Sequence, residues 1–153
     1  MFLLEVVRAF TAAKVPYAVA GGYAVALHGA VRGTVDIDFV ISLKPKHLEA
    51  VELTLRSLKL VSRIPVTHQE ISKFRKEYIE NRNLVAWGFV DSKDPTRLVD
   101  ILLTDDISMQ KTTTKRIQGV DVKILALSSL IKMKKAAGRA QDLEDIKALE
   151  KLA

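Results

Sequence analysis

The chain has 153 residues, with 24 basic and 18 acidic side chains and a formal net charge of +6. This length supports one domain with a real hydrophobic core but not two large domains. The chain contains no cysteine, which excludes a disulfide framework, a thiolate zinc site and a cysteine nucleophile, and fits a reducing, cytoplasmic location. The positive charge favours anionic partners such as nucleotides or RNA, although a lysine-rich solvated surface would give the same balance.

Neither a secretory signal nor a membrane span is expected. Glu5 and Arg8 interrupt the first apolar stretch, and no basic region precedes it. The longest stretch without a formal charge, residues 15–31, is short for a membrane span and contains Pro16 and three glycines. We expect it to form a strand, a turn and a helix.

Apolar spacing and turn residues divide the chain into alternating helices and strands. The predicted elements, in chain order, are a helix over 2–13, a strand over 17–20, a helix over 23–27, a strand over 35–42, a helix over 45–58, a short strand over 59–64, a charged helix or lid over 68–80, strands over 84–90, 97–104 and 120–125, and helices over 127–137 and 140–152. Turn residues over 91–96 predict an antiparallel hairpin.

These elements predict a mixed α+β domain in which helices pack on a mixed β-sheet. Residues 1–125 would form the core, and residues 126–153 a C-terminal helical pair, interrupted at Gly138, that packs on this core within one compact domain.

Two acids, Asp36 and Asp38, lie in the apolar run Val-Asp-Ile-Asp-Phe-Val-Ile. Alternation along a strand directs both carboxylates to one face. Like charges on a half-buried strand repel and lose hydration, so the pair needs a compensating cation. Carboxylates at this spacing suit a hard divalent ion, most plausibly Mg²⁺ with substrate phosphates, whereas the plain alternative is two surface acids.

A third acid, Asp100, interrupts the apolar strand over 97–104. If this strand lies beside the Asp36/Asp38 strand, three carboxylates converge, as a two-metal phosphoryl-transfer site requires. Two acids would bind the metal that accompanies the triphosphate, and the third would help to hold a second metal and position the attacking hydroxyl. The alternative is a solvent-facing acid on an edge strand.

The glycine pair Gly21–Gly22 comes between a strand and a helix. Glycine lets backbone N–H groups approach a phosphate closely, and the start of the helix favours negative charge. Arg32, four residues before Asp36, is a candidate for binding phosphate oxygens as a planar fork. A tight turn without a ligand and an ordinary loop arginine are the alternatives. His28, at the end of the helix, is a weaker candidate.

In this order and spacing, the residues resemble the nucleotidyltransferase superfamily related to DNA polymerase beta. The motif Gly21–Gly22, Arg32, Thr34 and Asp36–Ile37–Asp38 is similar to the AbiEii-like branch of toxin–antitoxin nucleotidyltransferases. Lys134, Arg139 and Asp142 in the C-terminal segment match that branch too.

The resemblance implies Mg²⁺, a nucleoside triphosphate donor and transfer of a nucleoside monophosphate. It implies that Asp36, Asp38 and Asp100 bind metal, with two ions expected, and that Lys134 approaches the triphosphate. Gly21, Gly22, Arg32, Thr34, Arg139 and Asp142 would complete the nucleotide site, and Asp142 would organise Lys134 or Arg139. Solvated lysines and a helix-capping acid are the plain alternatives for the C-terminal residues.

The acceptor is the least specified part of this prediction. RNA such as tRNA, a protein or a small hydroxylated molecule are all open as acceptors, and an antitoxin or toxin partner or a second copy of the chain is open as a binding partner. No membrane partner is expected. The alternative function is a catalytically inactive nucleotidyltransferase fold that binds a partner, RNA or nucleotide without turnover.

Overall fold

The computed structural model describes residues 1–30, 33 and 35–153. Its elements are α1 (Phe2–Ala12), β1 (Tyr17–Ala20), α2 (Gly21–Leu27), β2 (Ile37–Ile41), α3 (Pro45–Ser57), β3 (Leu60–Ser62), α4 (His68–Arg82), β4 (Ala86–Asp91), β5 (Asp94–Asp106), the short 3₁₀ helix η1 (Ile107–Met109), β6 (Thr112–Ile117), β7 (Val120–Leu125), α5 (Leu127–Ala137) and α6 (Ala140–Glu150). Among the described residues, no helix combines the length and apolar character that crossing a membrane requires.

The strands form one mixed sheet with the order β3-β4-β5-β2-β1-β7-β6. β2 is parallel to β5, and β1 is parallel to β7. The other neighbouring strands are antiparallel, including the predicted hairpin of β4 and β5. The predicted mixed sheet with packed helices is therefore confirmed.

One face of the central strands packs against α1. Phe39 of β2 contacts the ring of Phe10 at 5.1 Å and that of Tyr17 at 5.9 Å, both edge to face. Ile37 and Phe39 are fully buried. Because side chains alternate along a strand, Asp38 between them points to the opposite face.

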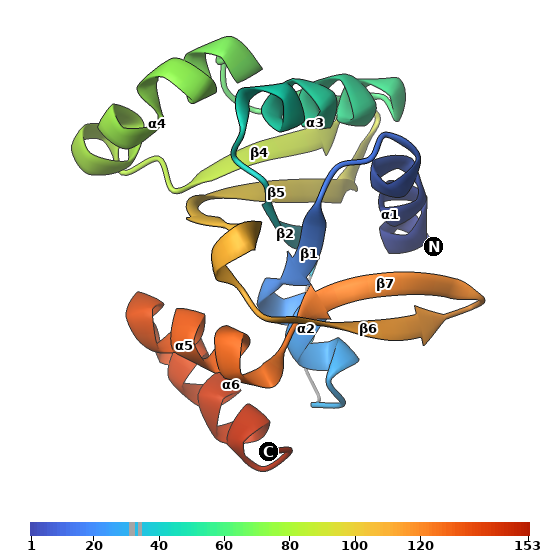
Figure 1. Cartoon of the computed structure of the whole chain (residues 1–153), viewed down its shortest axis with the longest axis vertical. Coiled ribbons are helices and arrows are strands. Elements are labelled where there is room, and N and C mark those ends of the chain that lie inside the picture. The colour runs from blue at the N-terminus through green and yellow to red at the C-terminus, as the bar shows by residue number, and fades with distance from the viewer. Residues whose placement is uncertain (31–32, 34) are drawn as a thin grey trace.

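Figure 1 shows α3 across the top and α1 at the right, whereas α5 and α6 lie together at the lower left. Gly138, with a φ of +65°, lies between α5 and α6 and ends α5 in the left-handed region that glycine adopts without strain. α5 contacts α2, which follows β1 directly. Through α5, the C-terminal pair thus packs against α2.

Three boundaries near the site differ from the sequence prediction by two or three residues. α2 begins at Gly21, not at residue 23, because Gly21 makes the turn itself with a φ of +60°. β5 begins at Asp94, so the hairpin turn is shorter than the predicted 91–96 linker. β2 begins at Ile37, so that Asp36 precedes the strand.

One strand, β6, was absent from the sequence prediction. Its residues are Thr-Thr-Thr-Lys-Arg-Ile, and nearly all of them are exposed. It lies at the edge of the sheet and pairs only with β7. Because neither of its faces is buried, no apolar alternation marks it in the sequence.

Candidate active site

The parallel pairing of β2 with β5 brings the predicted acids together. Asp38 and Asp100 are direct register partners on the two strands. One carboxylate oxygen from each of Asp36, Asp38 and Asp100 lies within 4.8 Å of the other two. The prediction that three carboxylates converge required the two strands to be adjacent, and β2 and β5 are adjacent.

Burial and repulsion between like charges disfavour ionisation of Asp38 and Asp100. Burial, together with the charges of Asp36 and Asp100, raises the pKa of Asp38 to about 7. Burial, together with a hydrogen bond to Asp36 and its charge, raises the pKa of Asp100 to about 6. A bound cation would relieve this repulsion and favour the ionised forms of Asp38 and Asp100.

The donor set fits a hard divalent cation. Three carboxylates offer six oxygens, and oxygen donors are the ligands that Mg²⁺ prefers. The set contains no thiolate or imidazole, the ligands that favour zinc or copper. Asp36, Asp38 and Asp100 are therefore the residues of this chain that would hold such an ion.

Two glycines leave room for the carboxylates. A Cβ added at Gly21 would collide with Oδ2 of Asp38 and lie 2.8 Å from its Cγ. Gly88 of β4 is the register partner of Asp100, and a Cβ there would lie 3.0 Å from Oδ1 of Asp100. Backbone approach to both acids thus depends on glycine.

Lys134 of α5 forms a buried ion-pair network with α6. Its Nζ lies 2.8 Å from Oδ2 of Asp145 and 3.4 Å from Oδ1 of Asp142. The exposed fraction of all three side chains is 7% or less. Gln141 donates a further hydrogen bond to Asp145. These contacts hold the Lys134 ammonium near Asp38, where its positive charge partly offsets the burial that raises the pKa of Asp38.

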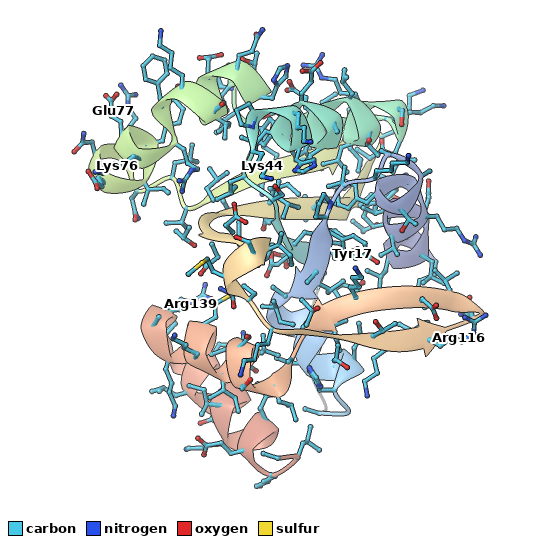
Figure 2. All side chains as sticks on the ribbon, in the orientation of Figure 1. Tyr17, Lys44, Lys76, Glu77, Arg116 and Arg139 are labelled. Carbon is cyan, nitrogen blue, oxygen red and sulfur yellow. The ribbon has the colours of Figure 1, made fainter. Side chains whose placement is uncertain are left out.

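Arg139 connects the same network to solvent. Its Nε lies 2.7 Å from Oδ2 of Asp142, while its own side chain is 74% exposed. Burial opposes ionisation of Asp142, but the hydrogen bonds and charge of Arg139 dominate and lower the pKa of this acid. In Figure 2, Arg139 lies between the α5–α6 pair and the end of β5.

A cavity of about 130 Å³ joins these groups. Gly21, Asp38, Lys134, Arg139 and Asp142 all line it. A second cavity of about 440 Å³, lined by Lys111, Ser129 and Lys132 among others, shares Asp105 and Met133 with the first. Acidic and basic groups therefore face each other across one space, with further room beside it.

The other residues that the sequence analysis named as candidates are not among the described lining of the small cavity. Gly22 is buried within α2 and does not line the small cavity. His28 forms a 2.7 Å hydrogen bond with the Leu125 carbonyl, as a structural residue does. Arg32 and Thr34 lie outside the described residues, and their roles stay predictions.

Sequence reasoning missed Asp145 and Gly88 as parts of the site. Asp145 is the closer of the two acids to Lys134, but it lies eleven positions away, across the Gly138 break, so no local pattern links them. Gly88 did carry a signal, because a glycine within an apolar strand often marks close approach of another group.

No protein-family model matches the chain, and no curated protein matches its sequence. Solved structures do match. The lincosamide antibiotic adenylyltransferase LnuA, with bound lincomycin, has a TM-score of 0.67 at 15% identity and covers 99% of this chain and 96% of its own.

Two further structures are similar over nearly the whole chain. ANT(2'')-Ia in complex with adenylyl-2''-tobramycin has a TM-score of 0.62 at 12% identity, covering 98% of this chain and 90% of its own. An antigenic nucleotidyltransferase-like protein from Paracoccidioides brasiliensis has a TM-score of 0.62 at 18% identity, covering 99% of this chain and 76% of its own. The likeness to the AbiEii-like branch stays a prediction from the sequence motif. The chain has the nucleotidyltransferase fold.

Proposed function

We propose that this protein is a Mg²⁺-dependent nucleotidyltransferase that transfers a nucleoside monophosphate from a nucleoside triphosphate to an acceptor hydroxyl. The observation that carries the proposal is the convergence of three carboxylates within 4.8 Å beside a cavity lined by Lys134 and Arg139. Phosphoryl transfer depends mainly on positioning and on neutralising negative charge, and this arrangement provides groups for both.

Asp36, Asp38 and Asp100 would bind the metal, with two ions expected by resemblance. Mg²⁺ at such a site neutralises phosphate charge and lowers the pKa of a bound hydroxyl. Asp38 faces the small cavity, so it would bind on the side of the donor triphosphate. Asp100 would position the acceptor hydroxyl and accept its proton as the bond to the α-phosphate forms and pyrophosphate leaves.

The cations of the C-terminal pair would bind the donor phosphates. Lys134 is held in place by Asp142 and Asp145, which limits its freedom and pre-orients its ammonium toward the cavity. Arg139 is held by Asp142, but its side chain is 74% exposed, so guanidinium N–H groups that face solvent can donate to phosphate oxygens. Gly21 lines the same cavity, and Gly22, Arg32 and Thr34 belong to the proposed nucleotide site on the sequence motif alone.

The acceptor classes that the sequence leaves open are RNA such as tRNA, a protein and a small hydroxylated molecule. The similar structures LnuA and ANT(2'')-Ia bind lincomycin and adenylyl-tobramycin, which supports a small molecule as one class. A toxin–antitoxin setting, with a toxin or antitoxin partner, follows only from the sequence resemblance.

The test is transfer of label from α-labelled nucleoside triphosphates. The protein is incubated with each triphosphate, Mg²⁺ and total cellular RNA, and in parallel with lincomycin and tobramycin. We expect label to move to one acceptor or to the protein itself, and Asp38→Asn to reduce the rate by roughly 100-fold or more, because it removes charge from the metal site.

Asp121→Asn is the matched control, since Asp121 is an exposed acid that pairs with Arg116 away from the cavity. Equal transfer by wild type and Asp38→Asn would contradict the assignment of the site. No transfer at all, combined with Mg²⁺-dependent stabilisation by a triphosphate, would instead support the inactive binding module.

A further inference from the structure

Asp38 and Asp100 face two different spaces, although they are register partners. Asp38 lines the small cavity with Lys134 and Arg139 but does not line the groove on the other side. Asp100 lines that groove, of about 390 Å³, and does not line the small cavity. In an in-line displacement the attacking and leaving oxygens lie on opposite sides of the phosphorus. A donor held on the Asp38 side therefore leaves the groove to the acceptor.

Arg63 is the one basic side chain among the described residues that line this groove. Its lining includes Arg63, Asn83, Val85, Gly88 and Asp100, and the remaining described lining residues are apolar. Asp100 is the only acid among the described residues that line it. Asp100 would be occupied by metal, so the groove has no free carboxylate that could bind a cationic acceptor. The guanidinium of Arg63 could bind an anionic acceptor.

The position of Arg63 is fixed by the strand next to Asp100. Its backbone N–H donates a 2.8 Å hydrogen bond to the Gly88 carbonyl. Its Cδ would lie 3.0 Å from a Cβ at Gly88, so the side chain runs over this glycine. Oδ1 of Asp100 would lie 3.0 Å from the same Cβ, so the Arg63 side chain lies beside the acid that would hold the acceptor hydroxyl, and both line the groove.

We propose that the groove receives an acceptor that carries a phosphate group near its attacking hydroxyl, and that Arg63 binds this phosphate. The inference rests on the proposed nucleotidyl transfer and specifies its acceptor. A guanidinium binds phosphate oxygens through two parallel hydrogen bonds, which orient the acceptor as well as attract it. The acceptor class is thus anionic, in contrast to an amine-rich antibiotic such as tobramycin.

Binding is measured first, because it does not require turnover. The full chain is loaded with Mg²⁺ and a non-hydrolysable triphosphate, and this loading is confirmed by the rise in Tm. Two phosphate-bearing probes are then titrated, a labelled RNA hexamer with a free 3′-hydroxyl and glycerol 3-phosphate, with glycerol and tobramycin for comparison. Binding of the hexamer alone would identify nucleic acid as the source of the phosphate. Binding of both probes would identify a small phosphate ester as the source.

Arg63→Met should weaken binding of the phosphate probe by about tenfold or more, since a charge-assisted hydrogen-bond pair is lost. Arg116→Met, an exposed arginine on β6, is the matched control and should leave binding unchanged. Figure 2 shows Arg116 at the far end of the β6–β7 hairpin from Arg139. Val85→Asp, which adds an acid to the groove at a 45% exposed position, should weaken binding as well.

Transfer kinetics of the same variants distinguish a role of Arg63 in acceptor binding from an effect on Asp100 alone. In transfer assays, Arg63→Met should raise KM for the phosphate-bearing acceptor more than it lowers kcat. The proposal is overturned if neither phosphate probe binds the loaded protein, if tobramycin binds more tightly, or if Arg63→Met and Arg116→Met behave alike. A protein that fails to load the triphosphate would overturn the proposed function, and this inference with it.

Discussion

The two faces of β2 and β5 differ in what their side chains contribute. On one face, Phe39 and Ile101 are fully buried in the core under α1 and α3. On the other, Asp38 and Asp100 come from neighbouring positions of the same strands, and burial raises the pKa of both. Burial of the apolar face therefore stabilises the fold, whereas crowding of carboxylates on the other face destabilises it.

This difference shows how a small domain maintains a costly site. The rigid core fixes the register of β2 with β5, and the register in turn fixes the separation of Asp38 and Asp100. Burial and repulsion between the charged acids oppose this arrangement in the absence of a cation, and the apolar face holds the two strands in register. Strain of this kind at a site is compensated elsewhere in the fold.

The largest expected effect is a difference in the free energy of unfolding between substitutions at two adjacent positions, one on each face. Phe39→Ala should lower the free energy of unfolding by roughly 3–5 kcal/mol, because it removes a fully buried ring that contacts Phe10 and Tyr17. Asp38→Asn should leave this free energy unchanged or raise it, because it removes repulsion. Urea denaturation of both variants measures the contrast, and a loss of stability in Asp38→Asn comparable to that in Phe39→Ala would contradict it.

A smaller effect should appear in the pH dependence of stability without metal. The pKa values of about 7 for Asp38 and about 6 for Asp100 lie above the usual 3.8, so the folded state binds more protons than the unfolded chain between these limits. The contribution of these acids is therefore present at low pH and is lost as the pH rises from about 4 to about 7.

Thermal melts of wild type and Asp38→Asn across this window isolate that contribution. The difference in Tm between the two proteins should change by on the order of 5 °C, to the disadvantage of wild type at the higher pH. Adding Mg²⁺ at pH 8 should raise the Tm of wild type and not that of Asp38→Asn. A difference that is independent of pH and of Mg²⁺ would show that the acids do not interact as described.

Much of the fold followed from sequence patterns because the buried elements carry strong ones. The strand of Tyr17–Ala20 was predicted at the observed bounds, and α5 likewise. The hairpin pairing followed from turn residues between two apolar runs. β6 could not be predicted, since backbone pairing with β7 holds it and its side chains are exposed.

The site was predictable in its residue types and less so in its connections. The spacing of Asp36 and Asp38 gave a shared face, but only the sheet order establishes that Asp100 lies beside them. Asp145 contacts Lys134 across a helix break, and Arg63 lies beside Asp100 over Gly88 of a neighbouring strand. Such contacts depend on packing, and one sequence contains no local pattern for them.

The proposed function requires that Asp36, Asp38 and Asp100 hold the metal ion of a triphosphate whose phosphates lie on the Asp38 side. A crystal structure of the protein with Mn²⁺ and a non-hydrolysable nucleoside triphosphate tests it most directly, because the anomalous signal of manganese locates the ion. We expect Mn²⁺ on Asp36, Asp38 and Asp100, with the phosphates directed toward Lys134 and Arg139 and the Arg63 groove open. A triphosphate bound elsewhere, or manganese absent from the three carboxylates, would contradict the claim.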